Sequence, residues 1–241
     1  MILFYLFSIY LIYYMNQSIY TTAYYSLVIQ FIIAIICLTG TFINLNNDDK
    51  ILNEILILET IVQCIEFSFY IWLIFNFSQI KTNVSLIRYM DWFITTPTML
   101  FSLICFLIYY NNKQSGVSNE FLSIKQIYTS NSYTINTVFI FNAFMLILGL
   151  LGEIKIIKKY LATIIGFLAL VVSYYLIYSN FVGEHLINNY LFWINFILWS
   201  LYGIAYMFSF KYKNIFYNIL DIFSKNIIGL LIVLYILSIK Y

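Results

Sequence analysis

The sequence predicts an all-α membrane protein, a bundle of seven transmembrane helices with an extra short apolar segment at the N-terminus. Of the 241 residues, 63% are hydrophobic and only 9% are charged, whereas about a quarter of the residues in a soluble domain are charged. The mean hydropathy is +0.90. A helical span needs about 20 apolar residues, so the chain has room for seven spans with short loops. The net charge of +2 is too small to indicate nucleic-acid binding.

The first residues form a segment of their own. Met1 to Met15 carry no charge, are too few to span a bilayer and lack the basic flank of a signal peptide. We interpret residues 1–18 as a short helix that packs on the bundle or lies at the membrane interface, with an uncleaved signal as the alternative. Residues 19–241 then form the seven-helix domain.

Seven apolar stretches follow in order, and they cover residues 22–44, 51–75, 86–109, 133–151, 161–178, 186–210 and 214–237. The longest polar segment, residues 111–130, is rich in Asn, Ser and Lys and is predicted to be a loop. Cys37, Cys64 and Cys105 fall in three different stretches. An odd count without close spacing argues against a disulfide framework or a metal site, so we expect no bound metal and interpret the cysteines as core residues.

The third stretch carries a polar stripe. Arg88 and Asp91 are three residues apart, and Asp91 and Thr95 are four apart, so the three side chains share one helical face. Ser102 returns to nearly the same angle three turns later. Charges within the hydrocarbon layer are costly and usually functional, which makes this stripe a candidate site.

The last stretch supplies a positive partner. Lys225 lies near the middle of an otherwise apolar segment, and Asp221 lies one turn before it on the same face. The two acids, Asp91 and Asp221, and the lysine are predicted to form a compact cluster of offsetting charges. A purely structural ion pair between two packed helices is the alternative.

The second stretch also carries a polar face, in addition to those of the third and the last stretch. Glu59, Gln63, Glu66 and Tyr70 follow one another at intervals of four, three and four residues, which places them on one side of a helix. Two glutamates within the apolar zone are expected to face the bundle interior or a water-filled cavity.

These motifs resemble those of the microbial (type 1) rhodopsins. The resemblance lies in Arg-Tyr-x-Asp-Trp-x-x-Thr-Thr-Pro from Arg88 and in Asp-x-x-x-Lys from Asp221, and it spans all seven stretches. The triplet Asp91, Thr95 and Ser102 is similar to that of a branch of giant-virus rhodopsins. The resemblance implies that Lys225 carries all-trans-retinal as a protonated Schiff base, with Asp91 and Asp221 as counterions and Arg88 on their extracellular side.

The resemblance also implies a retinal pocket, whose expected residues are Trp92, Thr96, Met99, Met145, Gly149, Trp199, Tyr202 and Tyr70. A proline normally follows the tyrosine at position 202 in this family, and this chain has Gly203 instead.

Three functions are compatible with these residues. The first is a light-driven outward proton pump, an ion transporter and not an enzyme, in which Asp91 accepts the Schiff base proton. Because Ser102 replaces the usual acidic donor, we hypothesise that Glu59 donates instead, through water beside Gln63 and Glu66; donation from bulk water is the alternative. The second is a light-gated cation channel, since Glu66 and Asn226 resemble the polar constriction of channelrhodopsins. The third is a photosensor.

The expected partners are retinal, protons, the lipid bilayer and further copies of the same chain. The expected location is a multi-pass position in a membrane, which would be a host-cell or organelle membrane if the protein is viral.

The family orientation puts Lys50, Lys113, Lys125 and Lys240 in the cytoplasm. It leaves six lysines outside, at positions 81, 155, 158, 159, 211 and 213. Positive-inside counting alone favours the opposite orientation.

Overall fold

A computed structural model describes residues 2–80 and 84–240, with side chains from Gln17 onward. Across these residues it contains eight α-helices, two short helical turns and no strand. The elements are α1 (Ile2–Gly40), η1 (Asn47–Asp49), α2 (Ile51–Ile80), α3 (Val84–Gln114), α4 (Ile124–Glu153), α5 (Lys159–Ile177), η2 (Tyr178–Val182), α6 (Leu186–Met207), α7 (Phe210–Ser224) and α8 (Ile227–Lys240). Seven spans in the described chain are long and apolar enough to cross a membrane, with α7 and α8 together forming the seventh. The predicted all-α, multi-pass membrane architecture is confirmed.

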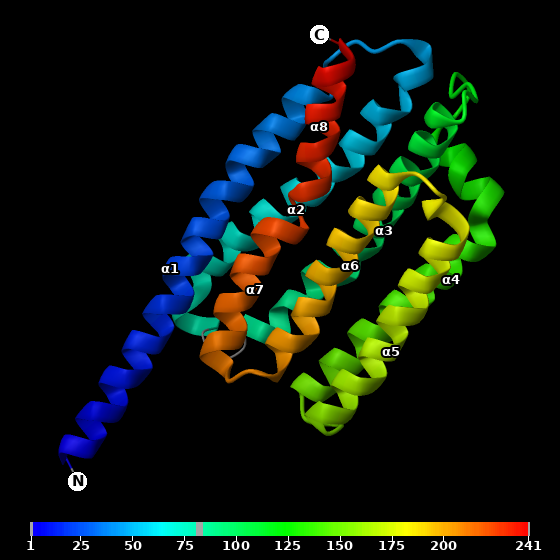
Figure 1. Cartoon of the computed structure of the whole chain (residues 1–241). Helices are drawn as coiled ribbons and strands as arrows, with labels where there is room; N and C mark the ends of the chain where they lie inside the picture. The colour runs from blue at the N-terminus through cyan, green and yellow to red at the C-terminus, as the bar shows by residue number, and fades with distance from the viewer. Residues whose placement is uncertain (1, 81–83, 241) are drawn as a thin grey trace.

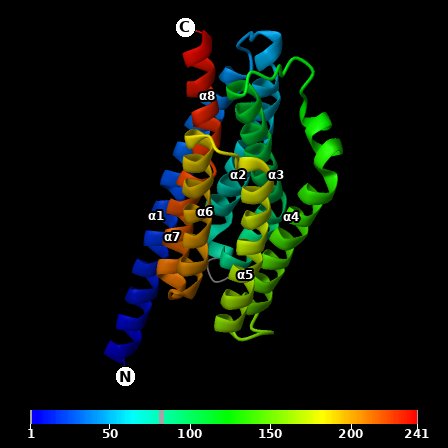
Figure 2. The ribbon, with the colours of Figure 1, turned by 45° about the vertical axis from the view of Figure 1, so that its right-hand side comes forward.

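The spans run alternately up and down, and the two chain termini lie at opposite ends of the bundle (Figure 1). Helix α1 packs against α2 and α7, and α4 packs against α5. The same arrangement is visible after rotation, with α4 and α5 on one side and α1 and α7 on the other (Figure 2). Helix α1 continues from the N-terminal segment into the first span without a break, so the proposed division at residue 18 stays a prediction.

The lysines divide between the two ends as the alternating spans require. Helices α2 and α4 begin at the end of the bundle that holds the C-terminus, which we call the C-terminal end (Figure 1). Lys50 directly precedes α2 and Lys125 lies in the first turn of α4, so both belong to this end. Lys155 and Lys211 lie near the opposite, N-terminal end. Lys81 lies outside the described residues.

The seventh span is interrupted in its middle. Lys225 and Asn226 separate α7 from α8, and side chains from neighbouring helices donate to backbone carbonyl groups around the break. Gln30 of α1 donates to the Asp221 carbonyl at 3.3 Å, and Gln63 of α2 donates to the Lys225 carbonyl. The break therefore places a buried lysine at a point where three helices meet.

The loop predicted for residues 111–130 is shorter than expected. Helix α3 continues to residue 114, and α4 already begins at residue 124, so the connection covers only residues 115–123. Ser123 caps α4 by accepting a hydrogen bond from the Gln126 amide at 3.2 Å. A capped and solvent-exposed helix tolerates the polar composition that we had interpreted as a loop.

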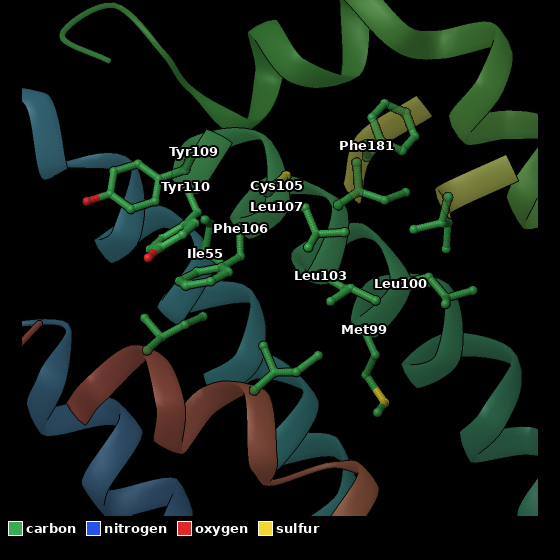
Figure 3. Close-up of a cluster of buried hydrophobic side chains, with 14 of the residues drawn as sticks. Ile55, Met99, Leu100, Leu103, Cys105, Phe106, Leu107, Tyr109, Tyr110 and Phe181 are labelled. Carbon is green, nitrogen blue, oxygen red and sulfur yellow. The ribbon is translucent and has the colours of Figure 1, made fainter. Parts of the chain in front are cut away.

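Buried apolar side chains fill the C-terminal half of the bundle around α3. Ile55, Leu103 and Phe106 belong to this cluster (Figure 3). Cys37 and Cys105 are buried in it as predicted, but the prediction is wrong for Cys64, which is exposed. Cys64 directly follows the buried Gln63 and so lies off the inward face of α2.

Candidate functional site

The centre of the candidate site is Lys225. Its side chain is only 2% exposed, and its Nζ contacts the carboxylates of Glu66 on α2 and Asp91 on α3. A lysine in such a place needs charged partners, because an isolated ammonium is costly to bury. The two acids that the second and third spans carry on their inward faces are therefore brought to one nitrogen atom.

Asp221 does not share that nitrogen. Its carboxylate accepts hydrogen bonds from Arg88 Nη1 at 2.9 Å, Tyr70 Oη at 2.7 Å and Tyr202 Oη at 2.6 Å. The predicted cluster differs in its contacts: Glu66 joins Asp91 on the lysine nitrogen, whereas Asp221 pairs with Arg88 within the same cluster. Three donors already satisfy Asp221, and the long lysine side chain reaches past it to α2 and α3.

Arg88 is fully buried, and its side chain contacts both polar and aromatic groups. Its second terminal nitrogen donates to Asn218, and the guanidinium lies 5.7–5.8 Å from the ring centres of Phe69, Tyr70 and Tyr217. A planar guanidinium suits such a bonded and stacked environment. Arg88 and Asp221 thus form a fixed pair toward the N-terminal end from Lys225.

Glu59 lies beside Ser102, on the C-terminal side of Lys225 in the bundle, as predicted. The Ser102 hydroxyl donates to Glu59 Oε1, and Glu59 is 1% exposed. The Thr95 hydroxyl donates to the Asp91 backbone carbonyl at 3.1 Å. The inward face of α2 is confirmed, since Glu59, Gln63 and Glu66 are all buried.

An apolar cavity extends from Lys225 between α3, α4, α5, α6 and α7. Seven of the expected pocket residues line it: Trp92, Thr96, Met99, Met145, Gly149, Trp199 and Tyr202. Tyr70 does not, and that expectation is corrected, because its hydroxyl is directed to Asp221. The sequence analysis missed the remaining lining residues, which are Tyr89, Leu146, Ala162, Thr163, Gly166, Phe167, Leu170, Gly203, Tyr206, Tyr217 and Ser224.

Most of the missed residues gave little signal. The sequence of α5 does not distinguish its cavity-lining apolar side chains from those that face lipid. Tyr217 is the exception, because it lies one turn before Asp221 and therefore on the same inward face.

The cavity wall is closely packed. The Trp92 ring meets those of Tyr202 and Tyr217 edge-on, with centroids 5.6 and 5.0 Å apart. A Cβ atom on Gly149 would lie 2.6 Å from the Tyr89 hydroxyl, so only glycine fits there without movement. Such walls hold a flat apolar ligand in one orientation.

The chemistry of the cavity fits retinal. Its walls are mainly aromatic and aliphatic, which suits a conjugated hydrocarbon chain. Its end is formed by a primary amine that can condense with an aldehyde, beside carboxylates that stabilise the resulting cation. The fold and the site together define a retinal-binding, seven-helix membrane protein.

The chain belongs to the family of bacteriorhodopsin-like proteins, whose sequence model matches residues 21–239. It is thus a microbial rhodopsin, as its motifs indicated. No curated protein sequence matches the chain.

Several solved structures are similar. The viral rhodopsin OLPVRII is 26% identical with a TM-score of 0.79, over 92% of this chain and 98% of that one. The proton-pumping rhodopsin AR2 from the marine alga Acetabularia acetabulum is 18% identical with a TM-score of 0.71, over 93% and 96%. Xanthorhodopsin, described as a light-driven ion pump with dual chromophore, is 15% identical with a TM-score of 0.69, over 94% of both chains. The last two support the fold alone, whereas the first also supports the resemblance to viral rhodopsins.

Proposed function

We propose that this rhodopsin is a light-driven outward proton pump that binds all-trans-retinal on Lys225. The observation that carries the proposal is the direct contact between the Asp91 carboxylate and Lys225 Nζ, which lines the cavity. This contact gives the nitrogen a counterion and an acceptor for its proton in the same group.

Retinal, when bound, supplies absorption of light and an isomerisation that redirects the N–H bond at its attachment point. The protein supplies the surroundings. Trp92, Trp199 and Tyr202 hold the polyene within the cavity, and Asp91 stabilises the positive nitrogen in the dark. After isomerisation, Asp91 receives the proton from the Lys225 nitrogen.

The release path leads toward the N-terminal end. Arg88 and Asn218 lie beyond Asp91 in that direction, and a further buried polar pair, Ser85 and Asn214, follows with a hydrogen bond of 2.9 Å. Buried polar groups at this depth are expected to border water or one another. We propose that the proton leaves along this row.

The return path starts at Glu59. Ser102 cannot donate a proton at neutral pH, but it holds Glu59 by a hydrogen bond. Gln63 lies one turn further along α2 and contacts the Lys225 carbonyl. Leu103 and Phe106 belong to the apolar cluster of the C-terminal half (Figure 3). Because this cluster restricts bulk water, we propose Glu59 as the internal proton donor.

The direction and driving force of transport can be tested directly. Cells or oriented vesicles that contain the retinal-loaded protein are illuminated with no ion gradient and no applied voltage. A pump produces an outward proton current and acidifies the outside medium, and a protonophore abolishes the acidification. Absence of current at zero gradient would refute pumping.

A light-gated cation channel is the second candidate, and one observation favours it. Near the break in the seventh span, the side-chain oxygens Gln30 Oε1, Gln63 Oε1 and Asn226 Oδ1 are buried without a hydrogen-bond partner in the described part of the chain. Unpaired acceptors of this kind can solvate a cation. The same recording separates the two functions, because a channel current reverses when the cation gradient is reversed.

A further inference from the structure

The charges around Lys225 do not balance. Three acids, Glu66, Asp91 and Asp221, lie within the same buried cluster as two bases, Arg88 and Lys225. All five side chains are at most 5% exposed. If every group were ionised, one negative charge would be left over, and an uncompensated buried charge is strongly unfavourable.

The hydrogen-bond donors do not suffice either once retinal is attached. A free lysine ammonium has three N–H donors, and Lys225 uses them to contact both Glu66 and Asp91. Attachment of an aldehyde leaves one N–H. Among the side chains that the structure describes, Glu66 Oε1 and Asp91 Oδ1 already lack a hydrogen-bond partner, so the loaded protein would hold two carboxylates with a single donor between them.

We propose that Glu66 is protonated in the dark, retinal-bearing protein, and that its O–H donates to Asp91, which alone accepts from the Lys225 N–H. One proton then corrects both the excess charge and the missing donor. This inference rests on the proposed attachment of retinal to Lys225 and deepens it, because it makes Asp91 the single ionised counterion on the nitrogen.

Glu66 is the better bearer of the proton for two reasons. Its side chain is completely buried, whereas Asp91 retains 5% exposure, so ionisation of Glu66 costs more solvation. Asp91 must also be ionised in order to accept the proton after illumination. The titratable and charged groups that face Glu66 come from four helices: Tyr70 on its own helix, Arg88 and Asp91 on α3, Tyr202 on α6, and Asp221 with Lys225 on the seventh span.

A bound monovalent cation is the competing solution. Sodium on the unpaired oxygens of Glu66, Asp91 and Gln63 would also supply the missing positive charge. A shared proton and a metal ion differ in their spectra and in their dependence on salt, so one experiment distinguishes them.

The test uses the purified, retinal-loaded full chain and two glutamate-to-glutamine variants on the same face of α2. Light-minus-dark infrared spectra record the C=O stretching band of protonated carboxyl groups. We expect one dark-state band that Glu66→Gln removes and that Glu59→Gln leaves in place. The proposed donor Glu59 should give a second band, which only Glu59→Gln removes. Visible absorbance is then titrated with pH in the dark. We expect a blue shift at alkaline pH, as Glu66 ionises beside the nitrogen, and no such shift in Glu66→Gln.

Two results would overturn the inference while leaving retinal attachment intact. One is a coloured Glu66→Gln protein that keeps every dark-state carboxyl band and the alkaline shift of the wild type. The other is an absorption maximum that changes when sodium is replaced by choline at constant pH, which would assign the charge to a metal ion. A wild-type chain that gains no colour with retinal would instead refute the proposed function, and the inference with it.

Discussion

The two sides of the bundle differ in what they bury. Between α1, α2, α3 and α7, the interior holds a row of polar side chains from Asn214 to Glu59. Between α3, α4, α5 and α6, it holds an aromatic cavity. Lys225 belongs to both sides, since it lines the cavity and contacts the acids of the polar row. The difference indicates a division of labour in which one side binds the cofactor by shape and the other binds and moves protons.

The largest expected effect comes from removing the residue that joins the two sides. Lys225→Ala should abolish visible absorbance after retinal is added, because no other amine lies at the end of the cavity among the described residues. The matched control is Lys213→Gln. Lys213 is also buried on α7, but its Nζ pairs with Glu153 Oε1 at a distance of 2.6 Å and does not contact Asp91 or Glu66. The Lys213→Gln variant should therefore keep its colour. Persistent colour in Lys225→Ala without added amine would contradict the assignment.

The next largest effects are expected from replacing the acids of the polar side. Asp91→Asn should keep the pigment but shift its absorbance to the red, because the counterion on the nitrogen is lost. Light-driven acidification should stop. Asp221→Asn should shift the spectrum less, since Arg88 and two tyrosines are the partners of that carboxylate. Normal pumping by Asp91→Asn, measured with a pH electrode, would exclude it as the acceptor.

A smaller effect is expected on the return path. If Glu59 is the donor, reprotonation in the wild type should be nearly independent of pH until Glu59 itself ionises. In Glu59→Gln it should become slower and fall about tenfold per unit rise in pH, as for a donor in bulk water. Time-resolved absorbance measures the rate, and azide should restore it.

Glu54→Gln is the control for the return path. Glu54 lies nearer the C-terminal end of the bundle, where it accepts a hydrogen bond from the Ile124 amide at 2.8 Å. Its replacement should leave the pH dependence unchanged. Identical photocycles of Glu59→Gln and wild type at every pH would eliminate the relay.

The smallest expected effect is a difference in stability between alanine variants of two glycines that line the cavity. Gly149→Ala should destabilise the protein by about 1–3 kcal/mol through overpacking, because the new Cβ would lie 2.6 Å from the Tyr89 hydroxyl. In Gly166→Ala the nearest atom is 3.7 Å away, so the gain in helix propensity, up to about 1 kcal/mol, should dominate. Thermal unfolding of both variants tests the difference. Equal unfolding midpoints would show that the Tyr89 side chain moves to accommodate the new Cβ atom at little cost.

The polar side was largely predictable from the sequence. Charged residues in apolar stretches are rare enough to stand out, and their spacing fixes the helical face. For this reason Glu59 could be placed beside Ser102 before any coordinates were known, and Lys225 could be placed near Asp91. Seven spans followed from hydropathy alone.

Pairings within the polar side were harder to predict. Spacing shows that Asp221 and Lys225 share a face, but it does not show that three donors compete for Asp221. Tyr70 was misplaced for the same reason. On the cavity side, the contribution of α5 could not be predicted, because inward and lipid-facing apolar side chains have the same chemistry.

The gap between α7 and α8 has a mechanical consequence. A continuous helix resists bending, whereas two short rods joined at Lys225 and Asn226 can pivot without breaking their own ladders of hydrogen bonds. The joint is clamped by Gln63 of α2, and α7 is anchored through Asp221 to Arg88. A strain applied to the lysine side chain would therefore be taken up as a change of angle at this joint, and not by bending of a continuous helix.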